Sequence, residues 1–276
     1  MDIKGPNLVK GIHLEGLRVL GSPESFAQYY YEQGADELIY QDVVASLFGR
    51  NSLSAIIRQT ARNIFIPLTV GGGIRSIEDI TNVLRAGADK VSINTAAIHT
   101  PDFIRVASKK FGSSTIVAAI ECIKQADGKY LVFINNGREE TGIEASQWAL
   151  QVEELGAGEI LLTSVDRDGT GTGFDIELTK MITSSVSIPV IAHGGAGTLS
   201  HFSQIIKEGK ADAVATASVI HYDALKYIAD SRPTQTEGNI SFLKTGRHTF
   251  SKVTNTGIGQ IKDYLIDQGI ECRTTN

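Results

Sequence analysis

Hydrophobic and polar positions along the chain follow two alternating patterns. Short aliphatic and β-branched runs predict strands at 38–40, 66–70, 90–93, 115–120, 160–163, 188–192 and 213–215. Amphipathic stretches between these runs predict helices, among others at 22–33, 76–86, 144–155 and 199–208. Nearly continuous apolar strands that alternate with helices are typical of a parallel sheet with a covered outer face. The pattern therefore predicts an α/β fold.

The two halves of the chain repeat one another. Segment 34–39 (GADELI) resembles 156–161 (GAGEIL), and 66–73 (IPLTVGGG) resembles 188–195 (IPVIAHGG), in both cases at a separation of 122 residues. Solenoids repeat every 20 to 50 residues or so, which excludes that architecture. Two copies of a (βα)4 unit make a (βα)8 barrel of about 250 residues. We therefore predict a single TIM barrel domain over residues 1–276.

Two segments depart from an ideal barrel. Only residues 2–4 stand where the first strand would run, which indicates either a clipped strand or a natural start upstream of Met1. The polar segment 223–257 separates the last predicted strand from a final predicted helix at 258–268. Connections this long usually act as lids, binding loops or flexible insertions. We interpret 223–257 as an insertion.

Composition excludes several classes of function. Lys and Arg number 26 against 31 Asp and Glu, a net charge of −5, so a general basic field for nucleic acid is not expected. The chain shows neither a secretory signal nor a stretch approaching ~18 apolar residues, and we expect a cytoplasmic protein without a membrane segment. Two cysteines and six histidines without metal-ligand spacing give no reason to expect a metal site.

Glycine-rich turns follow the third and seventh predicted strands. One contains Gly73 and the other Gly194 and Gly195, and each precedes a predicted helix. Exposed backbone N–H groups at such a turn, facing a helix N-terminus, can bind phosphate. Because the internal repeat relates the two turns, we expect a substrate with a phosphate at each end.

Two carboxylates end strands that lie opposite one another in an eight-stranded barrel. They are Asp2 on strand one and Glu121 on strand five. Facing carboxylates suit general acid and base catalysis on a substrate held between two phosphate sites. Asp168 lies near the same rim, and we interpret its loop as part of the second phosphate site.

Several long motifs resemble the cyclase subunit of imidazole glycerol phosphate synthase (the HisF family of histidine biosynthesis). They are 2–4 (DIK), 9–11 (VKG), 67–74 (PLTVGGGI), 88–94 (ADKVSIN), 156–164 (GAGEILLTS), 166–170 (DRDGT) and the turn at Gly194. The resemblance runs from Asp2 to about Tyr222 and resumes near Ile258.

The resemblance implies a role for each matching position. The catalytic carboxylates would be Asp2 and Glu121. The residues implied to bind the two phosphates are Gly73, Asn94 and Thr95 for one, and Asp168, Gly169, Gly194, Gly195 and Ser218 for the other. The family joins ammonia to a bisphosphorylated ribulosyl aminoimidazole carboxamide nucleotide and releases imidazole glycerol phosphate and an aminoimidazole carboxamide ribonucleotide. No metal or redox cofactor is implied.

The resemblance also implies a partner. Ammonia would come from a separate glutaminase subunit, docked on the N-terminal barrel face in a heterodimer, and would pass through the barrel. A charged ring guards that entrance in related proteins, and Glu37, Lys90 and Glu159 match three of its members, with Asp89 on the same face.

Two substitutions depart from the family pattern. Glu121 replaces an aspartate, and its extra methylene is on the scale of misplacement that can cost ~100-fold in rate. His193 replaces a small serine. It could add a contact to the phosphate, block the usual substrate, or be a polar residue without a role in binding. Both favour an alternative, a paralogue that passes ammonia from a glutaminase to a sugar amidotransferase of surface-polysaccharide synthesis. A phosphosugar isomerase fits the motifs less well.

Overall fold

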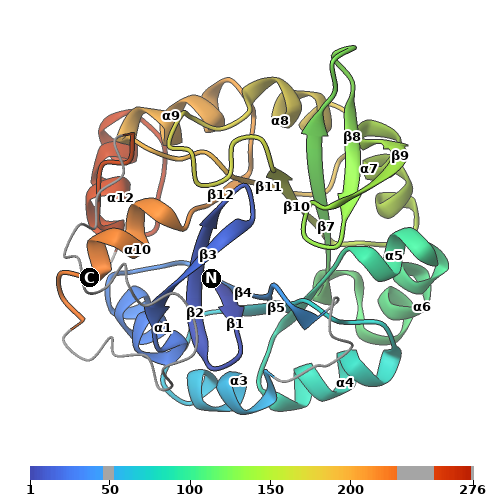
Figure 1. Cartoon of the computed structure of the whole chain (residues 1–276), viewed down its shortest axis with the longest axis horizontal. Coiled ribbons are helices and arrows are strands. Elements are labelled where there is room, and N and C mark those ends of the chain that lie inside the picture. Colours follow the sequence, from blue (N-terminus) through green and yellow to red (C-terminus); the bar gives the residue numbers. More distant parts are fainter. Residues whose placement is uncertain (46–52, 229–251, 275–276) are drawn as a thin grey trace.

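The computed structural model describes residues 1–45, 53–228 and 252–274. In these ranges eight strands run parallel around a centre, and Figure 1 shows helices surrounding them. In spatial order these strands are β1 (Asp2–Lys4), β4 (Leu38–Asp42), β5 (Leu68–Gly71), β6 (Lys90–Ile93), β7 (Ile116–Lys124), β10 (Glu159–Ser164), β11 (Val190–His193) and β12 (Ala213–Ala215). The predicted (βα)8 barrel is confirmed.

The helices bury one apolar face each against the sheet. They are α1 (Pro23–Glu32), α3 (Ser54–Ala61), α4 (Ile77–Ala86), α5 (Thr95–His99), α6 (Asp102–Phe111), α7 (Ala145–Glu154), α8 (Ile176–Thr183), α9 (Leu199–Lys207), α10 (Ser218–Ala224) and α12 (Ile258–Asp267). In α4 the buried residues Ile80 and Val83 are spaced by one turn, and a capping box between Ser76 and Asp79 fixes where the helix begins. Residues close in sequence therefore fix where the chain leaves the turn after β5 and enters α4.

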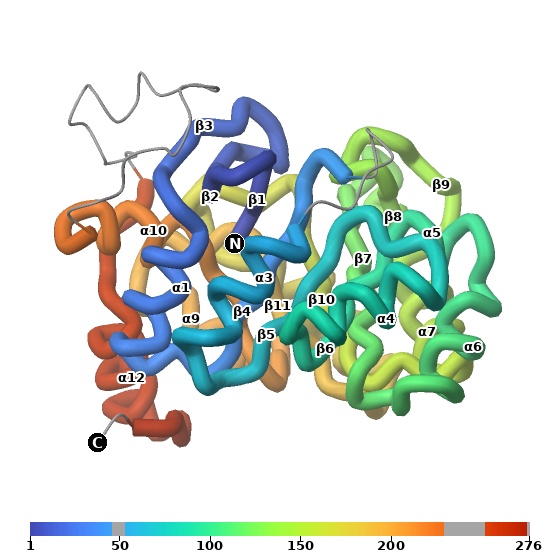
Figure 2. The backbone as a smooth tube through the Cα atoms, turned by 90° about the horizontal axis from the view of Figure 1, so that it is seen from below, coloured from blue at the N-terminus to red at the C-terminus, as the bar shows by residue number. Residues whose placement is uncertain are grey.

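Two antiparallel hairpins extend the sheet, and the hydrophobic pattern did not predict them. β2 (Asn7–Ile12) pairs with β1 and with β3 (Glu15–Gly21), while β8 (Tyr130–Ile134) pairs with β7 and with β9 (Glu139–Glu144). Figure 2 shows both hairpins on the same side of the barrel. Because β1 and β7 begin the two halves of the repeat, the hairpins are equivalent features of the two halves.

The internal repeat is visible in the hydrogen bonds. The Leu68 N–H donates to Asp89 at 2.9 Å, and the Val190 N–H, 122 residues after Leu68, donates at 2.9 Å to Asp212, which lies 123 residues after Asp89. The paired turns also share their backbone conformation, with φ of +92° at Gly72 and +94° at Gly194. The two half-barrels therefore place their turns equivalently.

The wall of the barrel is not continuous over the described residues. β1 is three residues long and joins β4 on one side, and no backbone pairing joins β12 to β1 in the part of the chain that the structure describes. The interior therefore continues between these strands to α12, where Ile261 and Leu265 line it.

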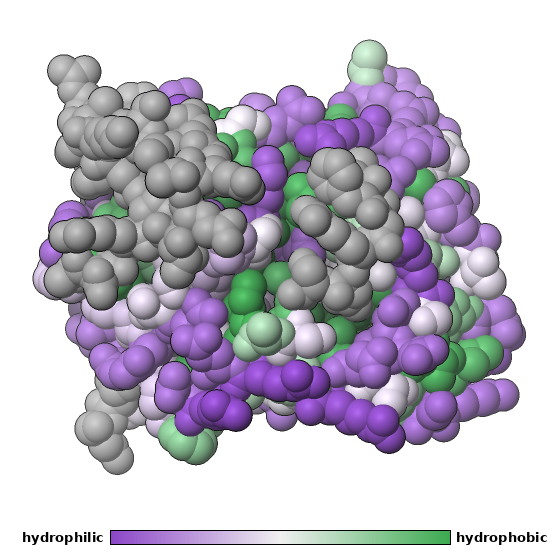
Figure 3. Space-filling view, turned by 60° about the horizontal axis from the view of Figure 1, so that its bottom comes forward, coloured by the Kyte–Doolittle hydropathy of each residue, from purple (hydrophilic) through white to green (hydrophobic). Residues whose placement is uncertain are grey.

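The described surface carries mostly polar side chains on the face in Figure 3, with smaller apolar patches between them. Of the predicted insertion at 223–257, residues 229–251 lie outside the described residues, and its first two residues end α10. None of the described helices has the length and apolar character needed to cross a bilayer.

Candidate active site

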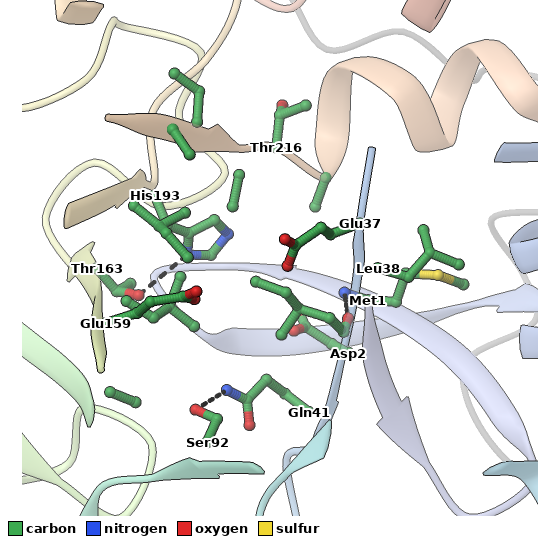
Figure 4. A pocket seen from close by; sticks show the side chains of 18 of the residues that line it. Met1, Asp2, Glu37, Leu38, Gln41, Ser92, Glu159, Thr163, His193 and Thr216 are labelled. Atoms are coloured by element: carbon green, nitrogen blue, oxygen red, sulfur yellow. Dashed lines mark hydrogen bonds between the residues drawn. The ribbon is translucent and has the colours of Figure 1, made fainter. Parts of the chain in front are cut away.

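A cavity of about 1100 Å³ occupies the barrel interior and reaches the carboxyl ends of the strands. Asp2, Glu121 and His193 line it, and Figure 4 shows Asp2 and His193 approaching it from different strands. The strand ends also bring Gly73, Asn94 and Thr95 to its wall. Residues from opposite ends of the sequence thus meet in one space, as the sequence predicts.

Asp2 belongs to a buried charge cluster centred on Lys10. The Lys10 ammonium lies 2.9 Å from Asp168 Oδ1 and 3.6 Å from Asp2 Oδ2, and its side chain is 1% exposed. Burial opposes the charged form of Asp168, but the Lys10 charge and hydrogen bond outweigh it and hold the Asp168 pKa below its ordinary value. Two carboxylates are therefore held around one cation beside the cavity.

Glu121 stands on β7 and is held by the hairpin that follows it. The Gly137 N–H, at the tip between β8 and β9, donates to Glu121 Oε2 at 2.7 Å. Burial raises the Glu121 pKa to about 7, although the Gly137 hydrogen bond acts in the opposite direction. Near neutral pH this carboxyl group can both give and take a proton, which suits general acid and base catalysis.

The first predicted phosphate site lies at the ends of β5 and β6. Gly72 and Gly73 have φ of +92° and +71°, and a Cβ on Gly72 would meet the Asp42 carbonyl oxygen at 2.3 Å, so only glycine fits the turn. Asn94 Oδ1 is buried without a hydrogen-bond partner in the described structure. A buried polar atom without a partner at a cavity wall indicates that a ligand or water completes the site.

The second predicted phosphate site is a small hollow beside the cavity. Its wall brings together the predicted residues of this site, which are Asp168, Gly169, Gly194, Gly195 and Ser218. Gly195 has φ of +110°, and a Cβ there would lie 2.1 Å from the Gly173 carbonyl oxygen. The backbone of this turn is therefore restricted to glycine.

His193 stands between the cavity and the hollow and lines both. Its Nδ1 lies 3.1 Å from the Thr163 hydroxyl, on the neighbouring strand. Burial lowers the pKa of His193, although the Asp168 charge acts to raise it. The ring is therefore neutral near neutral pH and held in one orientation.

Charged residues also meet at the opposite, N-terminal face of the barrel. The Lys90 ammonium lies 2.7 Å from Glu159 and 3.0 Å from Glu37. Burial lowers the Lys90 pKa, but the hydrogen bonds to Glu159 and Glu37 outweigh it and raise the pKa above its ordinary value. Glu37 and Glu159 line the cavity, so one continuous space reaches from this face to Asp2.

Two important contacts escaped the sequence analysis. Lys10 was part of a recognised motif but was not singled out, because a single lysine in a β run carries no signal of burial. Gly137 acts through its backbone N–H, which no side-chain pattern reveals. The repeat does not reveal it either, because neither hairpin is visible in the hydrophobic pattern.

The described residues contain no group of three or more His, Cys, Asp or Glu side chains placed to hold a metal ion. Cys122 is buried and Cys272 is partly buried, and both are free thiols.

Comparison with known proteins agrees with this geometry. A family model described as histidine biosynthesis protein matches residues 1–226. The imidazole glycerol phosphate synthase subunit HisF of Legionella pneumophila is 58% identical over 203 residues, covering 74% of this chain and 96% of that protein. The protein of that name from Alkaliphilus metalliredigens (strain QYMF) is 47% identical over 223 residues, covering 81% and 88%. The chain belongs to the family of imidazole glycerol phosphate synthase cyclase subunits.

Proposed function

We propose that the chain is the ammonia-dependent cyclase subunit of imidazole glycerol phosphate synthase in histidine biosynthesis. The substrate is a bisphosphorylated ribulosyl aminoimidazole carboxamide nucleotide, and the products are imidazole glycerol phosphate and an aminoimidazole carboxamide ribonucleotide. One observation carries the proposal: Asp2 and Glu121 reach a single cavity from opposite strands, between two glycine turns that the repeat makes equivalent.

Glu121 and Asp2 divide the proton transfers of the reaction. With a pKa of about 7, Glu121 is the group that exchanges a proton within the physiological range. Asp2, 3.6 Å from Lys10, faces the substrate from the other side. The turn at Gly73 with Asn94 and Thr95 holds one phosphate, and the turn at Gly194 and Gly195 holds the other.

Ammonia reaches this site through the barrel. The cavity extends from Glu37 and Glu159 to Asp2 and Glu121, so nitrogen released at the N-terminal face needs no passage through bulk water. The partner is a glutaminase subunit, bound as a heterodimer over the face that carries Lys90. A cytoplasmic location follows from this proposed pathway.

The test is an assay of the purified full-length chain with an ammonium salt and the bisphosphorylated nucleotide. Formation of imidazole glycerol phosphate, absent with a double variant Asp2→Asn and Glu121→Gln, supports the proposal. A wild-type chain that produces none in the presence of ammonia contradicts it.

One observation favours a second function. The side chain of Glu121 is longer than the aspartate of the family pattern, and the Gly137 N–H, at the hairpin tip, donates to its carboxylate at 2.7 Å. In this alternative the barrel conducts ammonia from a glutaminase to a sugar amidotransferase of surface-polysaccharide synthesis. A chain that lacks cyclase activity, but transmits glutamine-derived nitrogen to a co-purified amidotransferase, would support it.

A further inference from the structure

His193 occupies a position that neither proposed phosphate site accounts for. It ends β11 and precedes the Gly194 and Gly195 turn, so its ring stands at the rim where the second phosphate is expected. The Thr163 hydroxyl holds Nδ1 at 3.1 Å, and Figure 4 shows the other ring nitrogen on the side of the cavity. One nitrogen is therefore fixed by the protein, and Nε2 is left for a ligand at the wall that the cavity and the hollow share.

The surroundings of this nitrogen are incomplete. Thr216, next to the end of β12, lines both the cavity and the hollow, and its Oγ1 is buried without a hydrogen-bond partner among the described residues. His193 also lines both spaces, so the two side chains border the same region of the site. An unpaired hydroxyl on the wall of the hollow that His193 also lines indicates that a polar ligand group or water completes this site.

Charges of both signs surround the ring. Asp168 and Asp2 favour the imidazolium, whereas Lys10 and the Met1 ammonium oppose it, and His221 of α10 lies close enough to be affected by His193. Burial adds to the opposing side and keeps the ring neutral. An added dianion at the turn would favour the imidazolium, because it brings further negative charge close to the ring.

We propose that His193 is a substrate-contacting residue whose Nε2 takes up a proton from solvent when a dianionic group binds at the Gly194 and Gly195 turn, and then donates a hydrogen bond to that group. The proposal rests on the proposed function, which places a phosphate at this turn. It adds a positive charge that is present only in the bound state. The phosphate affinity of this site would consequently fall as the pH rises.

Inorganic sulfate is the appropriate probe, because its charge does not change over the range in which histidine titrates. Sulfate binding to the full-length chain is measured at about pH 5.5 and about pH 8. By reciprocity, a rise of one unit in the pKa of His193 corresponds to a tenfold change in affinity. We expect the wild-type dissociation constant to rise roughly three- to tenfold between the two pH values.

The variants His193→Ser and His193→Asn remove the titrating ring and should make sulfate binding nearly independent of pH. Both variants keep Glu121, so any pH dependence that Glu121 causes would remain in them. The variant His99→Gln removes the histidine of α5 that lines the cavity near the first phosphate site, and it should keep the wild-type profile because the pH dependence belongs to the second turn. NMR of the histidine rings should show a higher pKa for His193 with sulfate than without it.

The outcomes separate this inference from the function on which it rests. If sulfate binding is lost in Gly195→Ala but keeps its pH dependence in His193→Ser, the role of His193 is wrong and the phosphate turn stands. Sulfate binding that is undetectable in the wild type, or unaffected by Gly195→Ala, contradicts the phosphate turn and the role of His193 together.

Discussion

Asp2 and Glu121 are the side chains on which the proposed chemistry depends. Asp2→Asn and Glu121→Gln keep size and hydrogen-bonding capacity but remove the ability to exchange a proton. We expect each to lower ammonia-dependent turnover by ~100-fold or more, the scale of general acid and base catalysis. The matched control is Asp127→Asn, an exposed carboxylate in the turn after β7. Initial rates at saturating ammonia decide the question, and near-normal rates in both variants remove these residues from the mechanism.

The raised pKa of Glu121 also predicts how stability depends on pH. Because its pKa is about 7 in the folded chain, above the ordinary value, the folded state holds a proton that the unfolded state releases. This contribution to stability is complete below the unfolded pKa of about 4.3 and is lost as the pH rises through 7. Glu121→Gln carries no such proton, so between about pH 4 and pH 8 its stability relative to the wild type should rise by roughly 3 kcal/mol.

Urea unfolding of both proteins at the two pH values measures this difference. Asp127→Asn should show no comparable trend. A Glu121→Gln variant that tracks the wild type at every pH would mean that the carboxyl group titrates near its ordinary value.

The turn after β11 is the element on which phosphate binding depends. In Gly195→Ala the added Cβ would lie 2.1 Å from the Gly173 carbonyl oxygen at a φ of +110°, so backbone must move. We expect a loss of roughly 2 kcal/mol or more in the free energy of unfolding, together with loss of sulfate binding at this turn. Gly142→Ala is the control, since its φ is +71° but nothing lies within 4 Å, and it should cost about 1 kcal/mol. Equal losses in the two variants would show that φ alone, and not the close contact, matters.

The buried parallel strands could be predicted from the sequence, whereas the hairpins could not. β6 and β12 have the bounds expected from their apolar runs, and β6 is buried over three of its four residues, as a strand covered on both faces requires. β9 has the sequence EETGIE with exposed and partly exposed positions, so neither burial nor alternation marks it. β2 and β3 pair with irregular register, which breaks the period of two. These hairpins nevertheless carry Lys10 and Gly137, two contacts of the site.

The barrel itself followed from the repeat, since a separation of 122 residues relates whole half-barrels and not single motifs. The position of each site residue at a strand end also followed, because parallel strands bring their carboxyl ends to one face. The sequence did not predict that this face would be divided into a cavity and a neighbouring hollow. Asp168 and Gly195 border a hollow separate from the cavity that Asp2 and Glu121 line, and His193 stands between the two. The boundary between the cavity and the hollow depends on how side chains pack between strands that are distant in sequence.

Lys90 lies at the N-terminal face of the barrel, where ammonia is proposed to enter the cavity. It lies 2.7 Å from Glu159 and 3.0 Å from Glu37, at the end of the cavity opposite the catalytic carboxylates. Lys90→Met keeps the length of the side chain but leaves both glutamates without their cation, and partly buried charges without a partner reorganise or recruit water. We expect this variant, in complex with the glutaminase, to lose at least several-fold more glutamine-dependent activity than activity driven by external ammonia.

The comparison is made in the same preparation, by measuring both rates for the wild type, for Lys90→Met and for Lys129→Met. Lys129 also pairs with a glutamate, Glu144, but lies on the hairpin side of the barrel and should leave the ratio of the two activities unchanged. A selective loss in Lys90→Met means that nitrogen enters through the ring, because external ammonia can reach the cavity from the catalytic face. Equal losses with both nitrogen sources would mean that Lys90 supports the fold alone, and a chain that binds no co-encoded glutaminase would contradict the conduit altogether.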